Sequence, residues 1–261
     1  MSHIWILCLS LSCCLQPVFA SHSTLETSIR QEIEPYLIAE TNPAKKILDE
    51  IVATCSTNVF YDMKSMCAAG FDFAEPQHKT GIIVTRHPKL PGIIIKAYLD
   101  VQEYYEGKPE YYYWIKRVQG ANLIREAIKK YNYEHLLKVP RKWIYELPNN
   151  TYTVFPTKRK RFILVEDDMD ILDDKENKAR WGSPFATKEL LLALHTIITE
   201  FRFKDCAKPA NCPFSKDGRV ALVDTQSFYK RSVGYYKLTP YLTPEMQKYW
   251  KSLPHIGVKG H

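Results

Sequence analysis

The sequence predicts an α+β fold, because stretches with the periodicity of helices surround a group of short apolar segments typical of strands. Of the 261 residues, 45% are hydrophobic and 25% are charged, which suffices for one sizeable core or two smaller lobes. The sequence contains no internal repeat or low-complexity tract. The expected elements follow in chain order.

The N-terminal region is expected to be helical. Residues 24–48 carry aliphatic side chains at helical intervals, with breaks expected at Pro35 and Pro43. A further helix is expected over residues 44–54, after the second break. This region should pack on the rest of the fold.

Two buried strands are expected next, over residues 81–84 and 92–98, joined by a turn that contains two prolines. A helix follows over residues 117–131. At about 100° per residue, its apolar side chains form one arc, which includes Arg117 and leaves Glu126 on the opposite, polar face.

The remaining segments predict a helix, a hairpin and a short last helix. The helix is expected over residues 187–201, which are apolar at helical intervals. Asp217-Gly218 is a hairpin signal before the apolar residues 220–223. The last helix is expected over residues 243–253, with a threonine as its cap.

The first twenty residues are mostly apolar and have small or aliphatic residues at the last and third-last positions, which predicts a cleaved secretory signal peptide. A lipoprotein signal around Cys13 or Cys14 is the alternative. We therefore expect a secreted protein, or one in the lumen of the secretory pathway or the periplasm, with no membrane span after signal removal.

The cysteines agree with export. Removal of the signal leaves Cys55, Cys67, Cys206 and Cys212, an even number that suits an oxidising compartment. Two disulfides are expected, and the local pairs Cys55–Cys67 and Cys206–Cys212 are preferred among the three connectivities. A zinc site is the alternative, although the sequence has no C-x-x-C.

The formal net charge of +7 is modest, and acidic residues are interspersed with basic ones. The only dense basic run is Lys158-Arg159-Lys160-Arg161. Because no aromatic platform motif accompanies this run, a solvated turn is expected there, and no nucleic-acid partner is expected.

The most informative segment is Lys204-Asp205-Cys206-Ala207-Lys208-Pro209-Ala210-Asn211, followed by an apolar strand that ends at Asp224. An Asn amide and a carboxylate can share magnesium on ATP phosphates, while a second carboxylate accepts a hydrogen bond from the nucleophile. The segment resembles the catalytic core of protein kinases, in which a loop Asp and Lys-Pro-x-Asn precede a hairpin that ends in a metal-binding Asp. A hairpin with only a structural role is the alternative.

The resemblance implies a two-lobed kinase-like fold with a reduced C-lobe and an N-terminal helical extension. The expected parts are residues 1–20 as signal peptide, 21–70 as helical extension, 71–170 as N-lobe and 171–261 as C-lobe. It also implies ATP and Mg²⁺ as cofactors, with Asp205 as the catalytic base and with Asn211 and Asp224 as metal ligands.

Other nucleotide-site residues follow from the same resemblance. Lys96 resembles the phosphate-binding lysine of the third kinase strand. Residues 140–145 and 161–166 resemble the two strands before the kinase hinge, and Glu166 stands at the hinge that would hold adenine. Glu126 is the positional partner for Lys96, although its helix face argues against it. Arg117 is expected instead to face the nucleotide phosphates or Asp224. Two further acidic residues, Glu103 and Glu106, are alternative partners for Lys96.

Several features depart from the kinase pattern. Phe-Lys-Asp replaces His-Arg-Asp in the loop, and one extra residue separates Asp205 from Asn211. Thr225-Gln226 replaces Phe-Gly after Asp224, no G-x-G-x-x-G precedes Lys96, and the chain after Asp224 is too short for substrate-docking helices. These departures put catalysis in question.

We therefore expect a secreted kinase-like protein that binds ATP and magnesium and transfers phosphate to an unknown hydroxyl acceptor. Two alternatives stay open. One is a catalytically inactive pseudokinase that serves as a scaffold for a protein partner, and the other is a disulfide-stapled interaction protein without nucleotide.

Overall fold

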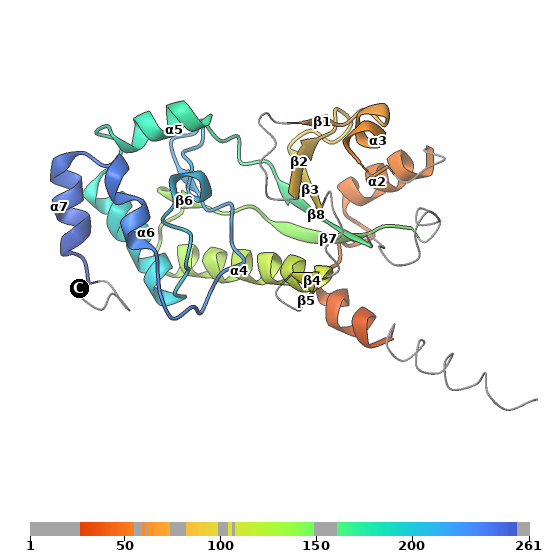
Figure 1. Cartoon of the computed structure of the whole chain (residues 1–261), viewed down its shortest axis with the longest axis horizontal. Helices are drawn as coiled ribbons and strands as arrows, with labels where there is room; N and C mark the ends of the chain where they lie inside the picture. Colours follow the sequence, from red (N-terminus) through yellow and green to blue (C-terminus); the bar gives the residue numbers. More distant parts are fainter. Residues whose placement is uncertain are drawn as a thin grey trace, which may run out of the picture. The chain divides into compact units, whose positions relative to one another are not determined.

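A computed structural model describes residues 27–54, 59–60, 62–73, 82–98, 104–105, 108–148 and 161–254. The chain forms two compact units that divide between Pro35 and Tyr36, where the 3-10 turn η1 (Glu34–Tyr36) lies. In the first unit, residues 27–33 are helical. The second unit has the expected α+β composition (Figure 1).

The second unit contains helices, strands and 3-10 turns of different lengths. In chain order they are α2 (Pro43–Thr54), α3 (Met63–Ala68), β1 (Asp72–Phe73), β2 (Ile82–Arg86), β3 (Ile93–Tyr98), β4 (Tyr104–Tyr105), β5 (Lys108–Pro109), α4 (Glu110–Lys130), β6 (Leu137–Lys138), β7 (Lys142–Glu146), β8 (Phe162–Asp167), α5 (Asp174–Trp181), α6 (Lys188–Glu200), η3 (Pro209–Asn211), β9 (Val220–Ala221), η4 (Tyr235–Lys237), η5 (Thr239–Tyr241) and α7 (Pro244–Ser252).

The main sheet is antiparallel and has the strand order β1-β2-β3-β8-β7. In this register Lys96 of β3 lies opposite Leu164 of β8, and Ile94 lies opposite Glu166. Lys142 of β7 lies opposite Glu166 as well. Because side chains alternate between the two faces of a strand, Lys96, Lys142 and Glu166 share one face of the sheet.

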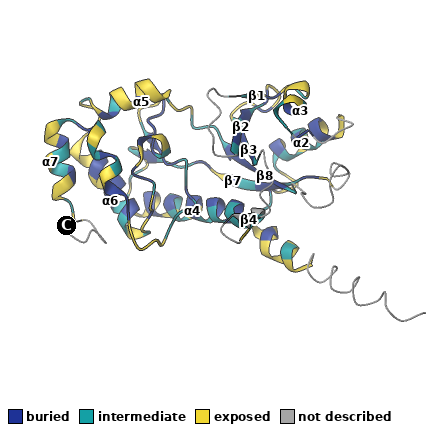
Figure 2. Ribbon diagram, in the orientation of Figure 1, coloured by how far each residue is buried: buried dark blue, intermediate teal, exposed yellow. Residues whose placement is uncertain are grey.

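Two apolar clusters stabilise the second unit. One joins α2 and α3 to the other face of the sheet, and Leu48 and Ile95 are fully buried in it. The second packs α5, α6 and α7 around the C-terminal half of α4, with Ile124, Leu194 and Trp250 at its centre. Figure 2 shows that α4 and α6 each have buried residues along one side. The helices α2 and α3 therefore belong to the core of the sheet.

Most of the expected elements are present, and the differences have local causes. The strands β2, β3, β7 and β8 and the helices α2, α6 and α7 are where the sequence predicts them. The helix α4 begins at Glu110 instead of Arg117, directly after Pro109. The helices α3 and α5 were not expected, because both are short. Their N-terminal turns are fixed by Asp62 and Asp173, whose side chains accept backbone hydrogen bonds.

The helix α4 lies close against the segment Val223-Asp224-Thr225, which follows β9. Thr225 Oγ1 donates a 2.6 Å hydrogen bond to the Arg117 carbonyl oxygen. A Cβ at Gly120 would lie 1.8 Å from the Thr225 carbonyl oxygen, so only glycine allows this approach. We call Val223-Asp224-Thr225 the docked segment.

Among the residues that the structure describes, no helix is both long and apolar enough to cross a membrane. The predicted signal peptide (1–20) and the greater part of the basic run, residues 158–160, lie outside the described residues.

The close approach at Gly120 gives a stability prediction. Alanine in place of glycine inside a helix normally stabilises it by about 1 kcal/mol. We expect Gly120→Ala to lower the free energy of unfolding instead, by about 1–3 kcal/mol, because the new methyl group overpacks the docked segment. Urea denaturation measures this change.

Gly182, the C-cap of α5, offers the matched control. A Cβ there would meet its nearest neighbour, the Tyr241 carbonyl oxygen, at 3.4 Å, an ordinary van der Waals contact. Gly182→Ala should change the free energy of unfolding by less than about 0.5 kcal/mol. A Gly120→Ala protein that is more stable than the wild type would contradict the docking of the segment on α4.

Candidate functional site

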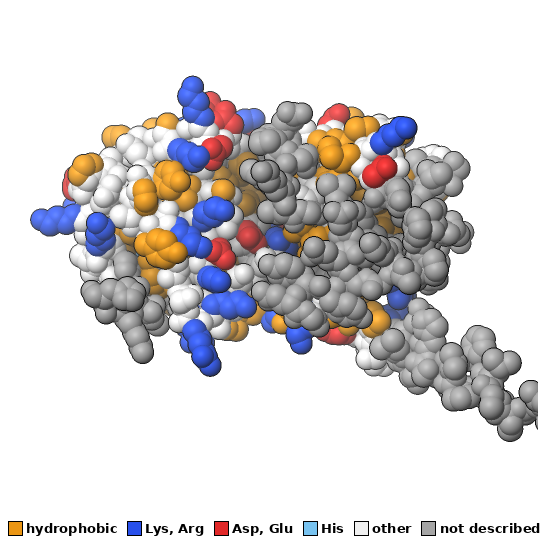
Figure 3. Space-filling view, viewed as in Figure 1, with side chains coloured by type: hydrophobic (Ala, Val, Ile, Leu, Met, Phe, Trp, Pro, Cys, Tyr) orange, Lys and Arg blue, Asp and Glu red, His pale blue; other side chains and the backbone are white. Residues whose placement is uncertain are grey.

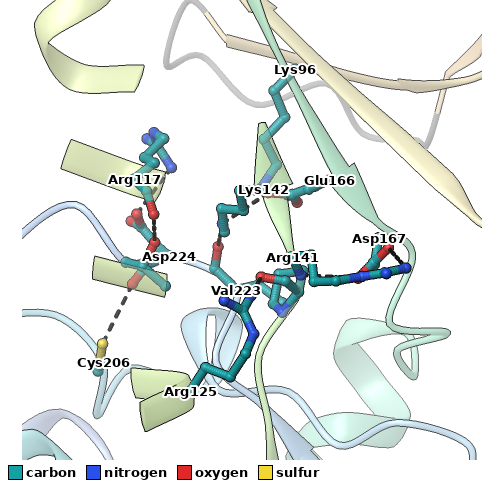
Figure 4. A network of polar contacts seen from close by, with 12 residues as sticks. Lys96, Arg117, Arg125, Arg141, Lys142, Glu166, Asp167, Cys206, Val223 and Asp224 are labelled. Atoms are coloured by element: carbon teal, nitrogen blue, oxygen red, sulfur yellow. Dashed lines mark hydrogen bonds and ion pairs between the residues drawn. The ribbon is translucent and has the colours of Figure 1, made fainter. Parts of the chain in front are cut away.

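Five charged side chains from distant parts of the sequence meet between the sheet, α4 and the docked segment (Figure 4). We call them the buried charge cluster. Its members are Lys96 on β3, Arg117 on α4, Lys142 on β7, Glu166 on β8 and Asp224 in the docked segment.

Glu166 is the centre of the cluster and is only 2% exposed. Its Oε1 lies 2.6 Å from Lys96 Nζ, and its Oε2 lies 2.8 Å from Lys142 Nζ. The second contact is an ion pair without aligned hydrogen-bond geometry. Burial acts to raise the pKa of Glu166, but the attraction of Lys142 and Lys96 outweighs it and lowers the pKa to about 2. The carboxylate therefore stays ionised at neutral pH.

Lys142 connects this pair to the docked segment. Its side chain is fully buried, and its Nζ also donates a 2.7 Å hydrogen bond to the Val223 carbonyl oxygen. Burial lowers the pKa of Lys142 to about 8, because the attraction of Glu166 offsets only part of the burial and of the repulsion by nearby cations. Next to it, Arg141 Nε and Nη2 donate to the two oxygens of Asp167 at 2.8 and 3.0 Å. This bidentate pair fixes the register of β7 and β8.

Arg117 and Asp224 form the second ion pair of the cluster. Arg117 Nη1 donates to Asp224 Oδ1 at 3.0 Å, and the side chains are 8% and 30% exposed. Burial acts to raise the pKa of Asp224, whereas Arg117, Lys96 and Lys142 lower it and prevail. The structure thus brings Arg117 to Asp224, one of the two positions that the sequence suggested for it.

The structure corrects the expected partner of Lys96. Glu126 is exposed on the outer side of α4, because the buried face of this helix is the arc that contains Arg117. The carboxylate beside Lys96 belongs to Glu166, which lies inside β8 and not in a solvated hinge. Glu103 and Glu106 lie outside the described residues.

The candidate base Asp205 lies in the loop after α6, and its carboxylate is ion-paired with Lys237 of η4. Asn211 Nδ2 donates to the Asp205 carbonyl oxygen at 3.1 Å. The carbonyl oxygen of Asn211 accepts from the Val223 amide at 3.0 Å, which ties this loop to the docked segment. The segment between them ends in the 3-10 turn η3 (Pro209–Asn211).

The expected disulfide between Cys206 and Cys212 is absent, because the structure contains both as free, buried thiols. Each thiol has its own backbone acceptor: Cys206 Sγ donates to the Asp224 carbonyl oxygen at 3.4 Å, and Cys212 Sγ donates to the Lys208 carbonyl oxygen at 3.2 Å. Burial raises the pKa of both thiols. Cys67 is a free, exposed thiol, so its expected pairing is absent too, and Cys55 lies outside the described residues.

Sequence reasoning missed several residues that build the site. Lys142 gave no signal of its own, because its place opposite Glu166 depends on the register of β7 and β8. Asn177 on α5 gave no signal, because it lies in a polar stretch. Its Nδ2 donates to the Pro209 carbonyl oxygen and its Oδ1 accepts from the Phe214 amide, both at 3.0 Å. This buried amide links the loop of Asp205 to the hairpin.

The arrangement does not suit a magnesium ion at Asp224. A carboxylate that holds Mg²⁺ must offer its oxygens to the metal, but one oxygen of Asp224 is engaged by Arg117. A divalent cation there would also be repelled by Arg117 and Lys142. In the described part of the chain, no three His, Cys, Asp or Glu side chains are grouped in a way that could hold a metal ion.

Comparisons with known proteins identify no relative. No protein-family model matches the chain, and no curated protein is significantly similar to it in sequence. The interpretation of the site therefore depends on the chemistry of its residues.

The lowered pKa of Lys142 predicts an alkaline gain in stability. Its folded pKa of about 8 is below the ordinary value of 10.5, so between these pH values the unfolded chain binds more protons than the folded chain. The contribution of Lys142 to the free energy of unfolding therefore rises with pH across this window.

Denaturation of the wild type and of Lys142→Met at pH 7 and pH 10 measures this effect. We expect the wild type to gain stability relative to the variant as the pH rises. A difference that is independent of pH would show that Lys142 keeps an ordinary pKa in the folded protein.

Proposed function

We propose that the protein is a nucleotide-binding module with a kinase-like, two-lobed fold whose charge pairs hold it in a non-catalytic state, as in a pseudokinase. Its ligand is ATP, and its role is to present a nucleotide-dependent surface to a protein partner in an exported compartment. The proposal combines the sequence resemblance with the geometry of the buried charge cluster.

One observation carries the proposal: Lys142 bridges Glu166, the partner of Lys96, and the carbonyl oxygen next to Asp224. Lys96 on β3 and Asp224 after the hairpin are 128 positions apart in the chain, yet they belong to one cluster. A kinase-like nucleotide site requires this proximity. The helix α4, which comes after β3, β4 and β5 in the chain, packs on β7 and β8.

Charge on the surface favours an anionic ligand. The loops that carry Asp205 and Asp224 also carry exposed basic side chains, and Figure 3 shows Lys and Arg gathered over this part of the molecule. The exposed basic side chains of these loops, by their burial, are Arg202, Lys204, Lys208, Lys230 and Arg231. Such a surface raises the local concentration of phosphate-bearing molecules.

The ion pairs argue against catalysis. Asp205 would have to leave Lys237 to act as a base, and Asp224 would have to leave Arg117 to hold a metal. The second candidate is an active phosphotransferase that uses ATP and Mg²⁺. The backbone hydrogen bond from Val223 to Asn211 favours it, because it keeps the three kinase-type residues in neighbouring segments.

A thermal-shift titration with ATP, with and without Mg²⁺, tests nucleotide binding. We expect ATP to raise the unfolding midpoint, by an amount worth about 2.7 kcal/mol at a hundredfold excess over the dissociation constant. Lys96→Ala should abolish the rise, because Glu166 and the phosphates lose this cation. Lys129→Ala, on the exposed side of α4, is the matched control and should respond like the wild type.

A folded wild type that shows no shift would favour the interaction protein without nucleotide. We expect no transfer of the γ-phosphate of ATP to water or to added protein acceptors. Transfer that disappears in Asp205→Asn would instead establish the active phosphotransferase.

A further inference from the structure

We infer that Arg117 takes the place of a metal ion, so that the site binds the phosphates of a nucleotide without magnesium. This inference depends on the proposed nucleotide binding and specifies its chemistry. The ligand is an anionic polyphosphate group, held by Arg117 and Lys96.

The first argument is the position of the guanidinium group. A metal that bridges phosphates to a protein carboxylate supplies positive charge next to that carboxylate. Here Arg117 supplies it, with Nη1 3.0 Å from Asp224 Oδ1. A guanidinium group has further donors in a fixed plane, and these suit phosphate oxygens.

Backbone contacts also hold Arg117 in place. Its carbonyl oxygen accepts the hydroxyl of Thr225, the residue after Asp224, at 2.6 Å. One turn further along α4, Gly120 lets the Thr225 backbone approach the helix. Because these contacts hold α4 and the docked segment together, Arg117 cannot withdraw from Asp224 by a movement of the helix alone.

The third argument is the charge balance. Three cations, Lys96, Arg117 and Lys142, face two carboxylates, Glu166 and Asp224, within the cluster. In addition, Arg117 Nε is buried and has no hydrogen-bond partner among the described residues. The excess positive charge of the cluster favours an anion over a cation, and the unpaired donor adds to this preference. A divalent cation would increase the imbalance.

Calorimetric titration of the full chain with ATP, in EDTA and in Mg²⁺, tests the inference. We expect the dissociation constant in EDTA to be within about threefold of that in Mg²⁺. Adenosine should bind at least about tenfold more weakly than ATP, because it lacks the phosphates that the cations hold.

Asp224→Asn gives the sharpest comparison, because the amide oxygen can still accept from Arg117. Removal of a negative charge next to the phosphates should leave ATP binding in EDTA unchanged or tighter. Loss of a metal ligand would weaken binding in Mg²⁺ instead. Arg117→Gln should weaken binding in EDTA at least about tenfold, and binding of this variant should then improve on addition of Mg²⁺, since Asp224 is free to hold the ion.

The outcomes separate the two proposals. Binding of ATP only with Mg²⁺, or its loss in Asp224→Asn, would overturn the inference and leave the proposed nucleotide binding intact. No binding by folded wild-type protein under either condition would overturn both. If Arg117→Gln fails to fold, Asp224→Asn still tests the inference. We expect this substitution to leave ATP binding unchanged or tighter, whereas the loss of a metal ligand would weaken it.

Discussion

The ion pair between Arg117 and Asp224 is the interaction on which the rest of the site depends. It joins α4 to the docked segment at 3.0 Å, and both residues are also held through their backbones. On one side Thr225 binds the Arg117 carbonyl oxygen, and on the other the Cys206 thiol binds that of Asp224. The aspartate is therefore confined to one position, where the kinase pattern would place a metal ligand.

The remaining charges follow from this confinement. Glu166, which is buried, is shared by two lysines, and Lys142 also donates a hydrogen bond to the Val223 carbonyl oxygen. Breaking a buried pair by removal of one partner typically costs about 3–5 kcal/mol, because the other charge stays buried. A cluster of this kind resists rearrangement, which favours a fixed binding site over a catalytic site that has to exchange partners during a reaction.

The sequence predicted the periodic elements well and the partners within the site poorly. The strand of Lys96 was found from its apolar run and that of Glu166 from the resemblance to kinases, and the helical wheel correctly placed Arg117 inward and Glu126 outward. The choice of Glu166 as partner of Lys96 depends on the register of β3, β8 and β7, which periodicity does not determine. The two expected disulfides are absent, because an even number of cysteines does not determine which thiols lie close enough to bond. The kinase-like fold itself stays a prediction.

A double-mutant cycle between Arg117→Met and Asp224→Ala, measured by urea denaturation, tests the dependence of the site on this ion pair, because neither substitute can form it. It isolates the pairwise coupling from the other effects of each substitution. We expect a coupling of about 2–3 kcal/mol, because each single substitution leaves the charge of the other residue without its partner. Additive effects of the two substitutions, with a coupling near zero, would contradict it and would leave Asp224 available to a metal.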